Sequence, residues 1–232
     1  MSDTLKLLSA GAVKRGVAQL AEAFARDRSC KVEVEFMQVP RLRKRVAAGE
    51  KADVIVATAG AMEEFAASGK IVADTRALLG RSRVGVVVHQ NAPTPDVHDT
   101  EAFQRALQSA SAVVRNDASS GLYIAELLDK LGLTAQLGNR IVVVNSGSAI
   151  ITAVAERGAG AIGMGQISEI RVMIDKGCPV KLVAPLPEAI QNVSTYYAAA
   201  ATASSAPDAA AALVRELTSA AAKKSFAATG ID

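Results

Sequence analysis

The sequence predicts an α/β fold in which mostly parallel sheets are flanked by helices. Short apolar segments typical of strands alternate with segments whose apolar residues recur at helical spacing, for most of the 232 residues. Glycines such as Gly49 and Gly69 follow the helical segments, where glycine commonly ends a helix. Several strands also run directly into small or polar residues that begin the next helix. This layout places ligand-binding groups at the carboxyl ends of the strands.

In the first third of the chain, strands are expected at 5–8, 31–37 and 53–57. The second strand alternates Val32, Val34 and Phe36 with charged residues, which is typical of a half-buried strand. Helices are expected at 13–26, 42–48 and 61–68. The first helix places Val17, Leu20, Ala21 and Phe24 at helical spacing, so one face is predicted to be buried.

The remainder of the chain continues the alternation. Strands are expected at 84–89, 112–114, 141–144 and 197–202, and a further short buried strand is expected just before Gln166, with Ser168 as the cap of a following helix. Helices are expected at 100–109, 122–131, 148–156 and 207–226. Thr100 is the expected cap of the first of these helices, and Ser205 of the last, because hydroxyl side chains favour N-cap positions.

The composition excludes some classes of function. Aromatic residues make up only 3% of the chain and Trp is absent, so platforms for stacking nucleic-acid bases are nearly lacking. The net charge of +3 is mild, and the one dense basic run, at 41–45, is interpreted as a solvated helix face. No nucleic-acid partner is therefore expected. No metal or cofactor is expected either, because no ligand spacing or phosphate-binding loop is present.

The two cysteines and the chain start bear on the cellular compartment. Cys30 and Cys178 are interpreted as free thiols in a reducing compartment, with a disulfide between them left open. The N-terminus enters a strand without the pattern of an export signal. The chain as written is therefore expected in the cytoplasm, or in the periplasm if it is a trimmed mature form. No apolar run is long enough to predict membrane insertion.

Five segments of the chain resemble a known family: 5–12, 49–56, 126–133, 155–168 and the C-terminal 217–230. The chain resembles the type 2 periplasmic binding protein fold, and within it the molybdate-binding proteins of bacterial ABC transporters. A related branch includes the aconitate isomerases. The resemblance implies two lobes, 1–81 plus 197–232 and 82–196, with two chain crossings as a hinge and a ligand cleft between the lobes.

Three positions depart from the molybdate-binding pattern. Ala12 stands where those proteins place a serine, and residues 37–40 replace a Ser-Ser-Gly loop without any hydroxyl. Gln166 stands where they place a tyrosine. The resemblance therefore implies a different small anion, and an organic polycarboxylate is expected in place of molybdate.

The candidate ligand-binding residues lie where strands meet helices. They are Ser9, Ala10, Gly11, Gln38, Arg41, Ser119, Ser120, Gly121, Gly147, Ser148 and Gln166. Free N–H groups at helix starts bind anions, small residues let a ligand approach the backbone, and the guanidinium of Arg41 suits a carboxylate. Some have a structural alternative: Asp117, Ser119 or Ser120 as a helix cap, Arg41 as a solvated surface residue, Gln166 as a loop-bonding side chain.

Two functions of different classes follow, both with a small anionic ligand as partner. The first is a solute-binding protein, which would serve an ABC transporter if the chain is exported. The alternative is an isomerase that moves a proton on an unsaturated polycarboxylate, for which Glu169, Tyr196, Tyr197 and His89 are the acid/base candidates. A third hypothesis is a sensor that passes lobe closure to another protein. His89 and His98 have no partner that the sequence identifies.

Overall fold

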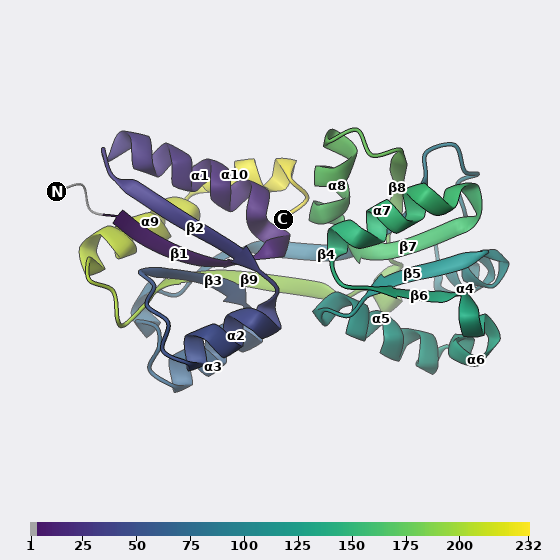
Figure 1. The fold of residues 1–232 in the computed structure, drawn as a ribbon, viewed down its shortest axis with the longest axis horizontal. Helices are drawn as coiled ribbons and strands as arrows, with labels where there is room; N and C mark the ends of the chain where they lie inside the picture. Colours follow the sequence, from purple (N-terminus) through teal and green to yellow (C-terminus); the bar gives the residue numbers. More distant parts are fainter. Residues whose placement is uncertain (1–3) are drawn as a thin grey trace. The chain divides into compact units, whose positions relative to one another are not determined.

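The computed structural model describes residues 4–232, which form two compact units (Figure 1). Unit 1 holds the described residues up to Ser82 together with Ser194–Asp232, and unit 2 is Arg83–Val193. The chain enters unit 2 within strand β4 (Ala77–His89) and leaves it at the start of strand β9 (Val193–Ala200). The sequence-based lobes had their boundaries at 81/82 and 196/197. Residues 1–3, part of the start in which no export signal was expected, lie outside the described residues.

Unit 1 contains a sheet in the order β2-β1-β3-β9. Its remaining strands are β1 (Thr4–Ala10), β2 (Lys31–Met37) and β3 (Val54–Thr58). Strands β2 and β3 both pair with β1 in parallel, whereas β9 pairs antiparallel with β3. The sheet is therefore mostly parallel, as predicted, with one antiparallel strand that the sequence pattern did not distinguish.

Helices cover both faces of the unit 1 sheet. They are α1 (Lys14–Asp27), α2 (Val39–Ala47), α3 (Ala59–Ala67), α9 (Pro207–Leu217) and α10 (Ala220–Ala228). Figure 1 shows α1 and α10 on one side of the strands and α2 and α3 on the other. Leu7, Val54 and Leu213 are fully buried between these layers. The apolar stripe predicted for the first helix faces this core, since Val17, Leu20, Ala21 and Phe24 are all buried.

Unit 2 contains a sheet in which β4, β7, β5 and β6 follow one another, with β8 on the other side of β4. The strands are β5 (Ala112–Asn116), β6 (Ile141–Val144), β7 (Ala161–Gln166) and β8 (Val180–Pro185). Strands β6 and β7 are parallel to β5, while β4 is antiparallel to β7 and β8.

Successive residues of the unit 2 strands face two separate cores, as the twofold period of a strand requires. The helices are α4 (Thr100–Ser109), α5 (Ser119–Lys130), α6 (Leu133–Leu137), α7 (Gly147–Arg157) and α8 (Ile167–Asp175). Val86 packs with Phe103 of α4 and Leu128 of α5. The next residue, Val87, packs with Ile150 of α7 and Ile170 of α8. The predicted α/β class, with helices on both sheet faces, is confirmed.

Several predicted helix ends are wrong. Asp99, not Thr100, caps α4, because its carboxylate accepts a hydrogen bond from the backbone N–H of Ala102 at 2.7 Å. Ser205 caps nothing: the N-cap of α9 is Ala206, and Pro207 starts the helix.

Other elements differ in extent from their predictions. The single helix expected at 207–226 is two helices, separated where Ser219 caps α10. Helix α2 starts three residues earlier than expected and α5 also starts three earlier, so that Ser119–Gly121 form its first turn. The final strand runs from 193 to 200, not from 197 to 202. Helix α6 and strand β8 were not predicted, and α8 starts at Ile167, before the cap expected at Ser168.

The histidines and cysteines have simple surroundings. His98 does have partners, contrary to the sequence interpretation: its ring nitrogens lie 2.7 Å from Asp96 Oδ1 and 2.9 Å from Asp99 Oδ2. Cys30 and Cys178 are both free thiols.

Across residues 4–232 no helix is both long and apolar enough to cross a membrane. Within the same residues no cluster of three or more His, Cys, Asp or Glu is placed to hold a metal ion.

Candidate functional site

Three parallel strands of unit 2 end together and each runs into a helix. Asn116 of β5 pairs with Val144 of β6, and Val114 of β5 with Gly163 of β7, so the carboxyl ends of all three strands lie at one edge of the sheet. Helices α5, α7 and α8 begin at this edge, which we call the unit 2 edge. Ligands of open α/β sheets bind outside such carboxyl ends.

All the predicted site residues of unit 2 come to this edge. Ser119, Ser120 and Gly121 form the first turn of α5, Gly147 and Ser148 open α7, and Gln166 ends β7 and is the N-cap of α8. Ser119 and Ser148 are exposed, whereas the other four are buried. The predicted residues are therefore neighbours along one sheet edge, although they are far apart in sequence.

The helix starts of the unit 2 edge differ in how their N–H groups are capped. Ser146 caps α7, because its hydroxyl accepts a hydrogen bond from the N–H of Ala149 at 3.2 Å. Ala118 and Gln166, the N-caps of α5 and α8, make no side-chain capping bond in the described structure. First-turn N–H groups without an intrahelical partner are suited to an anion, and the helix dipoles favour negative charge there.

Gly121 is required by packing within unit 2. A Cβ at this position would lie 1.9 Å from the carbonyl oxygen of Asn116, so only glycine lets the first turn of α5 approach the end of β5 so closely. The sequence interpretation placed this glycine at a helix start that binds an anion. The structure gives it a second reason, because strand and helix touch there.

Arg115 is a cation at the unit 2 edge that the sequence interpretation missed. Its Nη1 donates hydrogen bonds to the carbonyl oxygens of Asn116 at 3.1 Å and Gly121 at 3.4 Å. Its Nε is buried and has no hydrogen-bond partner among the described residues. The available signal was a lone arginine that follows three apolar residues in a short strand.

Glu169, in the first turn of α8, brings a carboxyl group to the start of α7. A Cβ on Gly147 would lie 1.6 Å from Glu169 Oε2, so the carboxyl group occupies the space that a side chain at Gly147 would take. Burial raises the pKa of this carboxyl group from 4.5 to about 7. It forms no ion pair or hydrogen bond within residues 4–232. A group of this pKa can gain or lose a proton near neutral pH.

The carboxyl ends of β1, β2 and β3 form a similar edge in unit 1, which we call the unit 1 edge. Ala10 pairs with Met37, and Ser9 with Val56, so the three strands end together. Ser9 and Ala10 end β1, Gly11 begins a short 3-10 helix (Gly11–Val13), and Gln38 is the N-cap of α2. Thr58 at the N-cap of α3 completes this edge and was missed, although it also ends an apolar strand.

The residues of the unit 1 edge differ in their exposure. Ser9 is fully buried and its hydroxyl donates to the carbonyl of Ala10 at 3.1 Å, so its proton is already engaged. Gln38 is exposed, and Gly11 is half-buried with no atom closer than 3.8 Å to the position of a Cβ. Backbone groups and Gln38 are therefore more accessible here than the serine hydroxyl.

Arg41 lies exposed in the first turn of α2. Two other arginines of the basic run are engaged: Arg43 pairs with Glu64 at 2.9 Å, and Arg45 pairs with Glu35 and Glu50. Arg41 forms no ion pair with any residue that the structure describes. The basic run is thus only partly a solvated face, and Arg41 is the arginine that is free to meet a ligand.

The tyrosines named as acid/base candidates belong to unit 1. Tyr196 is buried, and the ring of Tyr197 lies 4.3 Å from the guanidinium carbon of Arg76. His89 ends β4 in unit 2, where its Nδ1 accepts a hydrogen bond from the N–H of Asn91 at 3.2 Å. Among these candidates, Glu169 lies beside Gly147, a predicted ligand-binding residue, and its pKa is raised to about 7.

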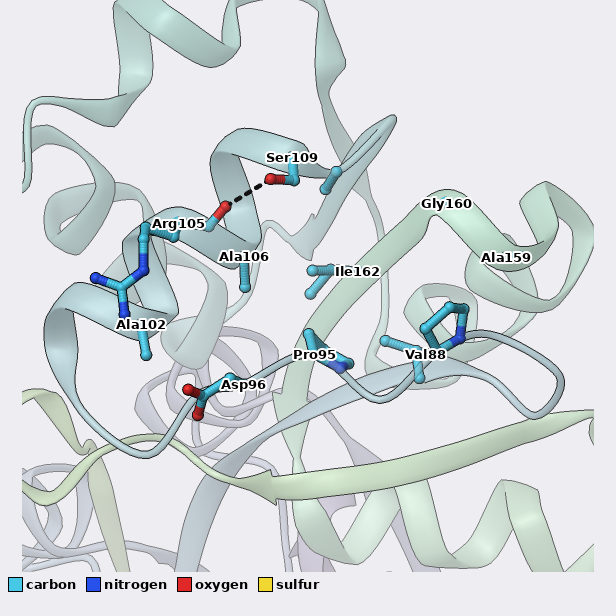
Figure 2. Close-up of a pocket in the computed structure, with 12 residues that line it drawn as sticks. Val88, Pro95, Asp96, Ala102, Arg105, Ala106, Ser109, Ala159, Gly160 and Ile162 are labelled. Atoms are coloured by element: carbon cyan, nitrogen blue, oxygen red, sulfur yellow. Dashed lines mark hydrogen bonds between the residues drawn. The ribbon is translucent and has the colours of Figure 1, made fainter.

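A cavity of about 370 Å³ lies elsewhere in unit 2, between α4 and the loop before it (Figure 2). Val88, Ala102 and Ile162 contribute apolar walls, and Figure 2 shows Asp96 and Arg105 among the residues that surround it. None of the predicted site residues lines this cavity. The helix starts of the unit 2 edge therefore form a separate candidate site.

With this geometry described, comparison with known proteins defines the class. The model of the bacterial extracellular solute-binding protein family matches residues 5–232. The chain belongs to this family, which accords with its α/β units and with helix starts gathered at the ends of parallel strands.

Individual relatives agree with the fold. The chain is 28% identical to an aconitate isomerase of Pseudomonas sp. over 98% of its own length and 87% of that protein. Its structure is similar to the periplasmic molybdate-binding protein of Azotobacter vinelandii, with a TM-score of 0.78, 18% identity and 98% of each chain covered. It is also similar to the tungstate ABC transporter structure of Geobacter sulfurreducens, with a TM-score of 0.75, 18% identity and 97% and 98% of the chains covered. The resemblance found in the sequence is confirmed.

Proposed function

We propose that this protein binds a small organic polycarboxylate anion, as a solute-binding protein, through helix starts at the carboxyl ends of its parallel strands. The supporting observation is the convergence of three helix starts at the unit 2 edge, two of them without a side-chain cap. Each helix start contributes on the order of 0.3–1 kcal/mol to binding an anion. A charge-assisted hydrogen bond adds about 1.5–3 kcal/mol, so micromolar binding requires several such contacts and a cation.

Arg41 is the proposed cation of unit 1. Its guanidinium is exposed and forms no ion pair with a described residue, and a planar fork of donors matches a carboxylate in two parallel hydrogen bonds. Arg115 supplies a second positive charge at the unit 2 edge, beside the start of α5. A carboxylate of the ligand can accept two parallel hydrogen bonds from a guanidinium of this kind.

Isothermal titration calorimetry tests this proposal. Citrate, trans-aconitate, molybdate and sulfate are titrated into the protein, and into Arg41→Ala. The polycarboxylates are expected to bind most tightly, and the variant to lose about tenfold in affinity or more, as for a charged hydrogen bond. Lys44→Ala is the matched control, because it removes an equal charge from an exposed position of the same helix. Absence of heat with all four anions contradicts the proposal.

An exported location, with an ABC transporter as partner, belongs to the same proposal. Support comes from the family, which is described as extracellular, and from relatives described as periplasmic or as parts of ABC transporters. Cell fractionation by osmotic shock, applied to the native organism, checks it. Recovery of the protein only with the cytoplasmic fraction would refute export and favour the intracellular alternatives.

A second candidate function is isomerisation of an unsaturated polycarboxylate. The specific observation in its favour is Glu169, whose pKa of about 7 lets its carboxylate act as a base beside the start of α7. The carboxylate would take a proton from the methylene next to the double bond. The electron pair would shift along the allylic system, and the proton would return at its far end, so that substrate and product have the same composition. Helix N–H groups would stabilise the enolate formed in between.

Proton NMR in deuterated water separates turnover from capture. The protein is incubated with cis-aconitate or trans-aconitate, and conversion or deuterium uptake is expected if it is an isomerase. Glu169→Gln is expected to abolish both, and Glu156→Gln, an exposed position on α7, to abolish neither. If the spectra do not change although calorimetry shows tight binding, the isomerase function is excluded and the solute-binding function is supported.

A further inference from the structure

Glu169 and the start of α7 occupy one place in unit 2. Because Oε2 lies 1.6 Å from where a Cβ of Gly147 would be, the carboxyl group touches the first residue of the helix. An anion that accepts a hydrogen bond from the N–H of Gly147 would lie within about 8 Å of this carboxyl group, given ordinary bond lengths and hydrogen-bond distances. Anion and carboxyl group therefore share one local environment.

The other charges near Glu169 in its unit are distant or engaged. Helix α8 packs against α7, β7 and β8. On α7 the charged residues are Glu156 and Arg157, in the last turn and about 13 Å along the helix from its start. Strand β7 has none, and Lys181 of β8 donates its Nζ to the carbonyl of Ala92 at 2.6 Å. On α8 itself, Arg171 and Asp175 are exposed. Burial is the sole cause of the raised pKa of Glu169, so no described charge of unit 2 compensates for it.

We propose that Glu169 takes up a proton when an anion binds at the unit 2 edge, so that the anion and a proton bind together. This inference rests on the proposed anion-binding function. The ionised carboxylate would repel the anion, whereas the neutral carboxyl group removes that repulsion and can donate its O–H to the ligand. The proton comes from solvent, and no bond other than Oε–H is formed.

The size of the effect follows from the distance. Two unit charges about 8 Å apart, at the effective dielectric constant of a partly buried site, repel each other enough to weaken binding about 30-fold. The same coupling raises the pKa of Glu169 by about 1.5 in the complex. The affinity of the protein is therefore expected to fall about 30-fold in total between about pH 6 and about pH 9.5, with about 8-fold of this fall between pH 7 and pH 8.5.

Calorimetry in buffers of different ionisation enthalpy measures the proton directly. Sulfate, molybdate and trans-aconitate are titrated in Tris and in HEPES near pH 7.8. The slope of the observed heat against the ionisation enthalpy of the buffer gives the number of protons taken up. About 0.7 proton is expected for each bound anion that places one negative charge near Glu169. The affinity is also measured from pH 6 to pH 9.

Glu169→Gln keeps the shape of the protonated side chain but cannot titrate. Its affinity is expected to stay constant across this pH range, to equal that of the wild type at pH 6, and to exceed it about 25-fold at pH 9. A purely structural role for Glu169 would not produce tighter binding at high pH. Glu156→Gln makes the same change of charge in the last turn of α7, so it is expected to keep the wild-type pH profile.

The outcomes separate the two proposals. Binding whose affinity and heat do not depend on pH or buffer overturns the proton inference and leaves the anion-binding function intact. Equal pH profiles for the wild type and Glu169→Gln also overturn it. If no anion binds at pH 6 or at pH 9, the anion-binding function itself is refuted and the inference falls with it.

Discussion

Replacing Glu169 by glutamine is expected to stabilise the protein at neutral and alkaline pH. Burial holds the pKa of this carboxyl group at about 7, against 4.5 when it is solvated. The native state therefore binds more protons than the unfolded state between these values. The free energy of unfolding must fall as the pH rises through this window, because the group has to ionise in a site that disfavours its charge.

The magnitude follows from the two pKa values. A difference of about 2.5 between the two pKa values destabilises the wild-type protein by about 3 kcal/mol. This destabilisation is complete above pH 7 and absent below about pH 4.5. Glutamine does not titrate, so the stability of Glu169→Gln relative to wild type should rise by about 3 kcal/mol between pH 4.5 and pH 8. Contributions from the other carboxylates occur in both proteins and cancel in the difference.

The assay is urea unfolding at pH 4.5 and pH 8, followed by far-ultraviolet circular dichroism because the chain has no Trp. Glu156→Gln serves as the control of equal charge change, and its stability difference should not depend on pH. If the difference between Glu169→Gln and wild type is the same at both pH values, the carboxyl group is not desolvated in solution. The reasoning from burial to proton binding would then be refuted.

Three further predictions concern other residues. Gly121→Ala should lower the free energy of unfolding by about 1–3 kcal/mol in urea, because its Cβ would meet the carbonyl of Asn116 at 1.9 Å and the backbone must move. Ser146→Ala should cost about 1 kcal/mol by the same measurement, because the N–H of Ala149 loses its cap. Arg41→Ala should leave thermal stability unchanged while weakening polycarboxylate binding in calorimetry, because the side chain is exposed.

Matched variants show whether these effects arise from the contacts described. Gly11→Ala, where the nearest atom to the added Cβ is 3.8 Å away, should cost much less than Gly121→Ala. Thr152→Ala, at an exposed position of α7, should not reproduce the loss expected for Ser146→Ala. Equal losses within either pair, or a large stability loss in Arg41→Ala, would contradict the assignments.

Most of the fold could be predicted because local patterns agree with it. The alternation of Val32, Val34 and Phe36 placed β2 at its observed bounds, and the apolar run at 141–144 placed β6. The failures occur where local signals compete. Residues 207–226 are rich in Ala throughout, so the helix pattern gave no sign of the break that the Ser219 cap introduces. Helix α8 follows β7 without a loop, so no turn residue marked its start.

The candidate site could be predicted less fully. Gln166 and Gly147 were found because each adjoins the end of a strand, which is a local feature. The environment of Glu169 could not be predicted from local sequence, since it depends on contact between helices that begin 20 residues apart. Arg115 was missed for a related reason: only the folded first turn of α5 brings its carbonyl acceptors together.

The interruption of unit 1 by unit 2 has a consequence for biosynthesis. A ribosome completes residues 83–193 before strand β9 exists, so unit 2 can fold on the nascent chain while unit 1 still lacks the partner of β3. The last residues then close unit 1, since the backbone of Asp232 exchanges hydrogen bonds with Arg81 at 2.6 Å and 2.9 Å. Translation thus completes the inserted unit before the enclosing one, which leaves the edge of β3 without its partner until β9 has been made.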